Sequence, residues 1–200
     1  MIEVIRAHLK RAAGLAAQAA ECLAEPASQA AQAIVDAVRD GHVVYVCGDG
    51  GSAAQAQHLA GELVGRFLID RPALPCVALT TDTSVLTAVA NDFDFEQVFE
   101  RQAEALIREG DVLIALSTSG ESVNVLKAAA LARGRGAKVI ALTGQGGGRL
   151  GELCDVALLA PAAASPLIQE IHLVVLHALC GAVEQALFAR GAEDAPKDEE

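Results

Sequence analysis

His58 and Glu62 are residues whose types and spacing could do chemistry, since they lie four positions apart in a stretch, 52–67, with a helical pattern. Side chains at positions i and i+4 project from the same face of a helix. An imidazole and a carboxylate placed in this way can bind a metal ion or act together as acid and base. The same spacing is common in simple surface contacts, so the pair alone leaves both interpretations open.

A second group of polar residues lies in the apolar stretch 165–190, which predicts a long closing helix. Gln169 and His172 are about one helical turn apart, whereas His177 follows Gln169 by eight residues, about 12 Å along a helix axis. Spacing therefore pairs Gln169 with His172. For either histidine, the alternative is a core residue whose ring bonds a backbone group.

Two turns, residues 48–52 (GDGGS) and 117–122 (STSGES), each follow an apolar run and precede a helical pattern. In an open parallel sheet, ligands bind where strands end and helices begin, because free backbone amides converge there. Neither turn fits the loops GxxxxGK[ST] or GxGxxG. The hydroxyl groups and amides of the second turn suit a phosphate monoester, although they could simply cap a helix. Asn91 and Asp92 end a helical piece and could likewise be a C-cap.

The elements that must position these residues alternate along the chain. Apolar runs predict five strands, and a helical pattern follows each of them: 42–47, 75–80, 111–117, 138–143 and 155–160. Near-continuous apolar strands separated by helices indicate a parallel sheet covered on both faces. The sequence therefore predicts one doubly wound α/β domain over 41–190. Before it, residues 1–40 predict a helical pair that is split at Pro26 and capped by Ser28.

Composition narrows the function classes. The formal net charge of −11 argues against nucleic acid or an anionic membrane as the main partner. The N-terminus lacks an uninterrupted apolar signal core, and the charge-free run 171–183 is too short to span a bilayer, so we expect a soluble cytoplasmic protein. No CxxC spacing occurs, and we expect reduced, buried cysteines at Cys22, Cys47, Cys76, Cys154 and Cys180. The acidic residues 191–200 predict a disordered tail.

Five segments together resemble the phosphoheptose isomerases of the sugar isomerase (SIS) family: VCGDGGSAAQAQHLAGEL, TAVANDFDFEQVF, EGDVLIALSTSGESVNVLKAA, ALTG and IQEIHLVVLH, in this order. The resemblance runs from about the second helix to the end of the closing helix. STSG alone marks only a SIS domain, which also occurs in regulators. The set of His58, Glu62, Gln169 and His177 is much more specific.

The resemblance implies one zinc ion per subunit, bound by His58, Glu62, Gln169 and His177, and so replaces the pairing with His172, which becomes a packing or supporting residue. Glu62 and His177 would be the catalytic acid and base. The implied substrate contacts, besides Gln169, are Asp49, Gly50, Gly51, Ser52, Asn91, Asp92, Ser117, Thr118, Ser119 and Ser122. The serine loop, residues 117–122, would bind the sugar phosphate. The family forms homotetramers with sites at subunit interfaces.

The implied reaction interconverts sedoheptulose 7-phosphate and D-glycero-D-manno-heptose 7-phosphate through an enediol(ate), the first step of ADP-heptose-type precursor synthesis, as for lipopolysaccharide. A base must remove the proton next to the carbonyl and return it to the neighbouring carbon, while the developing oxyanion is stabilised. Glu62 would then be both metal ligand and proton carrier, a conflict that the sequence leaves open.

Two residues depart from the family pattern: Asp49 stands where most members have Asn, and Gln55 where many have Asp. We interpret them as a compensating swap that moves a negative charge while conserving it. An Asp49→Asn, Gln55→Asp double variant should then be more active than either single variant, and additive effects would contradict the interpretation.

Two other classes of function are compatible with a SIS pattern. One is a non-catalytic tetrameric SIS protein that binds the replication initiator DnaA, a relative that lacks the full metal and acid/base set. The other is a sugar-phosphate-sensing regulatory domain, although no DNA-binding module is attached. The presence of both Glu62 and His177 favours the enzyme.

Overall fold

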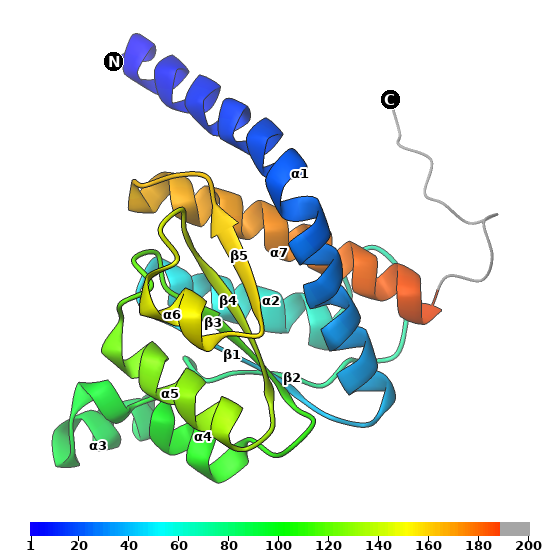
Figure 1. Cartoon of the computed structure of the whole chain (residues 1–200), viewed down its shortest axis with the longest axis vertical. Helices are drawn as coiled ribbons and strands as arrows, with labels where there is room; N and C mark the ends of the chain where they lie inside the picture. Colours follow the sequence, from blue (N-terminus) through cyan, green and yellow to red (C-terminus); the bar gives the residue numbers. More distant parts are fainter. Residues whose placement is uncertain (189–200) are drawn as a thin grey trace.

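Five parallel strands form one sheet, in the order β2-β1-β3-β4-β5, in the computed structural model, which describes residues 1–188 (Figure 1). The strands are β1 Val44–Gly48, β2 Cys76–Ala78, β3 Val112–Leu116, β4 Lys138–Gly144 and β5 Val156–Ala160. The central strands β1 and β3 are buried along their whole length, as expected for a parallel sheet with both faces covered. The predicted doubly wound fold is confirmed.

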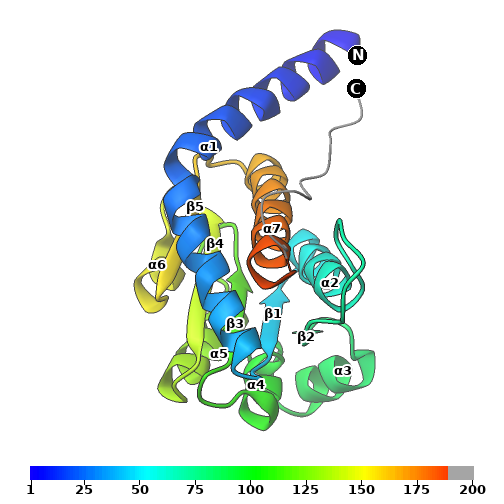
Figure 2. The ribbon, with the colours of Figure 1, turned by 90° about the vertical axis from the view of Figure 1, so that its right-hand side faces the viewer.

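Helices cover both faces of the sheet (Figures 1 and 2). They are α1 Ile2–Arg39, α2 Gly51–Val64, α3 Thr83–Asp92, the 3-10 helix η1 Phe95–Gln97, α4 Glu100–Leu106, α5 Val123–Gly134, α6 Gly148–Leu153 and α7 Ser165–Phe188. Strand side chains alternate between two apolar cores. Val44 and Val46 pack with α1, α2 and α7, while Tyr45 and Cys47 pack with α4, α5 and α6.

Helix α1 is one continuous helix, so the predicted break at Pro26 and cap at Ser28 are wrong. Proline costs about 3 kcal/mol inside a helix. Here the flanking residues are strong helix formers, and the buried Leu23 and Ile34, on either side of Pro26, anchor both halves in the core with α7. Figure 2 shows that α1 changes direction partway along its length, as expected for a helix that contains proline.

Helix α7 is, by length and composition alone, the one helix among residues 1–188 that could cross a membrane. From the sequence, the run 171–183 is expected to be too short to span a bilayer. The helix is longer than that run, because the apolar pattern continues beyond it on both sides. The helix packs against α1, α2, β4 and β5 and buries His172 and Glu184. These contacts are those of a core helix.

The cysteines are only partly as predicted. Cys47, Cys76 and Cys180 are buried, but Cys22 is exposed on α1 and Cys154 is half-buried. Burial raises the pKa of the Cys76 and Cys180 thiols to about 12, so both are neutral at physiological pH. The predicted disordered tail, 191–200, lies outside the described residues.

Candidate active site

The first glycine turn lies against the neighbouring strand at the carboxyl edge of the sheet. Gly48 pairs with Leu116, and a Cβ on Gly48 would come within 2.9 Å of the Leu116 carbonyl oxygen. Gly50, with a φ of 56°, caps α2 in a conformation that other residues rarely adopt. The turn at 48–52 therefore begins α2, which carries His58 and Glu62, as predicted from the sequence.

His58, Glu62 and His177 converge between α2 and α7. The Nε2 atoms of the two histidines are 2.8 Å apart, and His58 Nε2 is 3.3 Å from Glu62 Oε1. One possible ligand atom from each of the three residues lies within 4.8 Å of the others. Residues far apart in the sequence thus place two imidazole nitrogens and one carboxylate oxygen around one point. This donor set fits a divalent transition metal such as zinc.

Gln169, the fourth predicted ligand, lies on α7 against the first residue of α2. Its side-chain amide atoms are 2.6 and 2.7 Å from the position that a Cβ on Gly51 would occupy, so the amide lies directly against the Gly51 backbone and would have to move to admit a larger residue there. Among the described residues no hydrogen bond joins this amide to the three converging side chains. Ligation by Gln169 stays a prediction.

His172 differs from His177 in its surroundings. Its ring is buried, and its Nε2 atom lies 3.0 Å from the backbone oxygen of Thr143 on β4. Burial lowers its pKa, with a smaller opposing contribution from the bond to Thr143. The structure therefore gives His172 the packing role and brings His177, not His172, to His58.

The serine loop, residues 117–122, connects β3 to α5. Ser117 Oγ lies 3.0 Å from Ser122 Oγ, and Ser119 Oγ accepts a hydrogen bond of 3.1 Å from the Glu121 amide. Ser122 is the N-cap residue of α5, yet its side chain makes no capping hydrogen bond. Thr118 Oγ1 lies 3.3 Å from Ser165 Oγ at the start of α7. Simple capping by Ser122 therefore does not explain the loop, which offers hydroxyl groups at a helix N-terminus.

Asn91 and Asp92 are exposed at the end of α3, where the Asn91 amide donates a 2.8 Å hydrogen bond to Asp92 Oδ1. Figures 1 and 2 both show α3 well apart from α7. Within one chain the structure does not bring these two predicted substrate contacts to His177.

Asp49 and Gln55, the two residues that the sequence analysis interpreted as departures from the family pattern, contact different helices. Asp49 Oδ1 accepts a 2.8 Å hydrogen bond from Asn124 of α5, whereas the buried Gln55 donates a 2.6 Å bond to the Gln169 carbonyl of α7. Asn124 is a site neighbour that the sequence analysis missed, although a polar residue on the buried side of α5 was a usable signal. The compensating swap stays a prediction.

Comparison with known proteins gives a consistent result. Residues 7–144 match the family model of the SIS domain. A phosphoheptose isomerase from Rhodospirillum rubrum is 51% identical over 187 residues, which are 94% of this chain and 99% of the relative. A phosphoheptose isomerase from Desulfovibrio desulfuricans is 49% identical over 199 residues, which are 98% of this chain and 93% of the relative.

Solved structures agree with this result. The phosphoheptose isomerase of Neisseria gonorrhoeae superposes with a TM-score of 0.87 at 41% identity, and that of Francisella tularensis with 0.89 at 37% identity. Both alignments cover 92% of this chain and 98% of the other. The Vibrio vulnificus NanR protein shares only the fold. It is 19% identical and superposes with a TM-score of 0.68, and the alignment covers 92% of this chain and 63% of the NanR chain.

Proposed function

Because the chain belongs to the SIS family, and within it to the phosphoheptose isomerases, we propose that it interconverts sedoheptulose 7-phosphate and D-glycero-D-manno-heptose 7-phosphate at the cluster of His58, Glu62 and His177. The observation that carries this proposal is the convergence of these three side chains, with a 2.8 Å distance between the two histidine Nε2 atoms. A non-catalytic binding protein would have no need for this arrangement.

Glu62 and His177 would transfer protons at different atoms of the sugar. The carboxylate of Glu62, with its side chain 23% exposed, is open enough to remove a proton from the carbon next to the carbonyl and return it to the neighbouring carbon. His177 would hold or deliver a proton at the sugar oxygen. His58, Glu62 and His177, with Gln169, would hold zinc, which as a Lewis acid polarises oxygen atoms when it is bound.

Phosphate binding belongs to the serine loop. Its hydroxyl groups and the first amides of α5 would hold the phosphate without a cationic side chain. The phosphate is remote from the reacting carbons, so its binding energy serves to orient the sugar.

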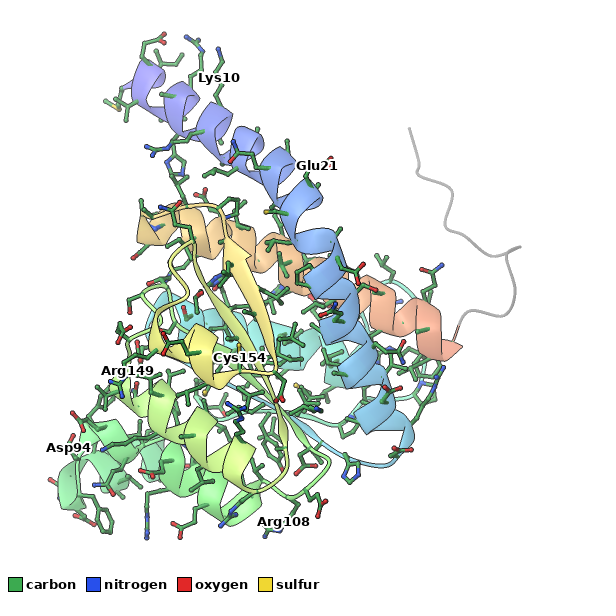
Figure 3. All side chains as sticks on the ribbon, viewed as in Figure 1. Lys10, Glu21, Asp94, Arg108, Arg149 and Cys154 are labelled. Atoms are coloured by element: carbon green, nitrogen blue, oxygen red, sulfur yellow. The ribbon has the colours of Figure 1, made fainter. Side chains whose placement is uncertain are left out.

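The exposed apolar residues on the protruding part of α1 favour an oligomer. Ile2, Val4, Ile5 and Leu9 are exposed there, and Figure 3 shows Lys10 and Glu21 on this same projecting segment. We assign residues 1–40 to packing on the domain and to subunit contacts, and residues 41–190 to the SIS domain. A cytoplasmic homotetramer with one zinc ion per subunit would let Asn91 and Asp92 of one chain complete the site of another.

The function is tested by proton NMR of sedoheptulose 7-phosphate in D₂O with purified protein, with and without zinc. We expect new aldose signals with deuterium at C2, because the proton that the base removes from C1 exchanges with solvent before a proton is returned to C2. No turnover under either condition by a folded tetramer would contradict the proposal.

The serine loop gives a separate prediction. Ser119→Ala removes a hydroxyl group from the exposed centre of the loop, and we expect kcat/KM to fall about 10-fold, mainly through a higher KM. Inhibition by inorganic phosphate should weaken in parallel. Steady-state kinetics would measure both, with Ser28→Ala on α1 as the control. An unchanged KM would place the phosphate elsewhere.

A further inference from the structure

A buried ion pair lies next to the cluster of His58, Glu62 and His177. Arg71 Nε donates a 2.8 Å hydrogen bond to Glu184 Oε1, and the two side chains are 1% and 4% exposed. Glu184 lies seven residues after His177 on α7, about two turns, so both side chains project from the same face of that helix. A buried ion pair gives little net stability by itself, which suggests a role in fixing geometry.

Glu184 also binds the loop that follows α2. Its carboxylate accepts hydrogen bonds from the amides of Phe67, Leu68 and Ile69, at 2.9, 2.9 and 3.2 Å. Burial opposes the charged form of this carboxylate, but the three amides and Arg71 outweigh burial and lower its pKa. The carboxylate thus holds three consecutive backbone groups in one orientation.

Arg71 holds the end of α2 itself. Its Nη2 atom donates to the backbone oxygen of Glu62, and its Nη1 atom donates to that of Leu63, each at 2.8 Å. The last carbonyl groups of a helix have no partner within it, and the planar fork of a guanidinium can bind two at once. The helical turn that carries the Glu62 side chain is therefore tied to Glu184 and so to α7.

Phe67 extends this connection to His177. Its ring stacks on the His177 ring with 5.5 Å between centroids and 27° between planes. Gly181, one turn after His177, lies beside that ring, since a Cβ there would be in van der Waals contact with Phe67 Cε1 at 3.7 Å. The Phe67 amide is one of the three that Glu184 binds.

We propose that Arg71 and Glu184 form a positioning clamp that fixes the Glu62 side chain, through its backbone, and the His177 ring, through Phe67, in the geometry needed for metal binding and proton transfer. This inference rests on the proposed function. Both side chains of the clamp are buried away from solvent, so they would act through Glu62 and His177 and not on the sugar directly.

Arg71→Met is the direct test. We expect kcat to fall about 100-fold while KM changes less than about threefold, because a displacement of about 1 Å in the catalytic groups has effects of this size. Zinc affinity, measured by competition with a chromophoric chelator, should weaken about 10- to 100-fold, as for other residues that orient metal ligands. Arg71→Lys should not restore kcat, since one ammonium group cannot reproduce the fork.

Ile107→Ala is the control for a general loss of stability. Ile107 is fully buried in the core on the opposite face of the sheet. Its replacement should lower the melting temperature and leave kcat and zinc affinity unchanged. If Arg71→Met does not fold, Phe67→Leu keeps the clamp but removes the stacked ring, and kcat should fall about 10-fold.

Each outcome separates the two proposals. Wild-type kcat and zinc affinity in Arg71→Met, or equal losses in Ile107→Ala, would overturn the clamp. The proposed function would be overturned if the wild-type protein binds zinc but does not convert sedoheptulose 7-phosphate. In that case the clamp would still be supported if zinc affinity is lost in Arg71→Met and kept in Ile107→Ala. A wild-type protein that does not bind zinc would overturn the clamp.

Discussion

Replacing Glu62 with Gln should reduce kcat for sedoheptulose 7-phosphate about 10³-fold, equivalent to about 4 kcal/mol of transition-state stabilisation. The amide has nearly the same shape as the carboxylate but cannot accept the proton from C1 of the ketose, next to the C2 carbonyl, or return a proton to C2. The Glu62 side chain is partly exposed and is paired with His58 at 3.3 Å, so the fold should not change. Deuterium incorporation at C2 in D₂O, measured by NMR, should disappear together with turnover.

Glu170→Gln is the matched control for this substitution. Glu170 is also paired with a histidine, since its Oε1 atom lies 2.6 Å from His8 Nε2, but that pair joins α1 to α7 seven residues before His177, about 10 Å along the helix axis. We expect wild-type kcat for the control. Equal activity losses in both variants would contradict the assignment of Glu62 as the base.

The zinc content of Glu62→Gln addresses the double role of this residue. A carboxylate has two oxygens, so one can bind a metal ion while the other carries a proton. Retained zinc with no turnover would show that proton transfer is the essential role. Lost zinc with residual exchange at C2 would show that the carboxylate is essential as a ligand.

Local patterns were sufficient to predict the strands and the turns. The five apolar runs became five parallel strands, of which β1 and β3 are buried along their whole length and the edge strands β2 and β5 only in part. The i, i+4 pair on α2 also followed directly from helical geometry, and His58 and Glu62 do lie 3.3 Å apart.

Long-range packing limited the rest of the prediction. Spacing within α7 favoured His172 beside Gln169, but only the position of α2 against α7 decides that His177 meets His58. Arg71 and Glu184 lie 113 residues apart, and no local pattern pairs them. Pro26 was predicted to end a helix because the packing of both halves of α1 is invisible in local sequence. The roles of Asn91 and Asp92 on α3 stay predictions, because both are exposed and bond to each other within this chain.

Replacing His58 with Ala should remove bound zinc and activity together. The three converging side chains supply two imidazole nitrogens and a carboxylate, and the loss of one nitrogen leaves too few donors for tight binding. We expect the zinc content, measured by elemental analysis, to fall at least about 10-fold. The kcat should fall at least about 100-fold. Treatment of the wild-type protein with a strong chelator should have the same effect, and added zinc should restore the wild-type protein but not the variant.

His172→Gln is the control that separates the two histidines of α7. His172 is buried and bonded to the Thr143 backbone, so its replacement should cost about 1–3 kcal/mol of folding free energy through an unmatched polar group. Its zinc content should stay at the wild-type level, because the ring does not face His58. The reverse result, zinc lost in His172→Gln and kept in His58→Ala, would mean that the metal binds where spacing along α7 alone would place it, beside Gln169 and His172.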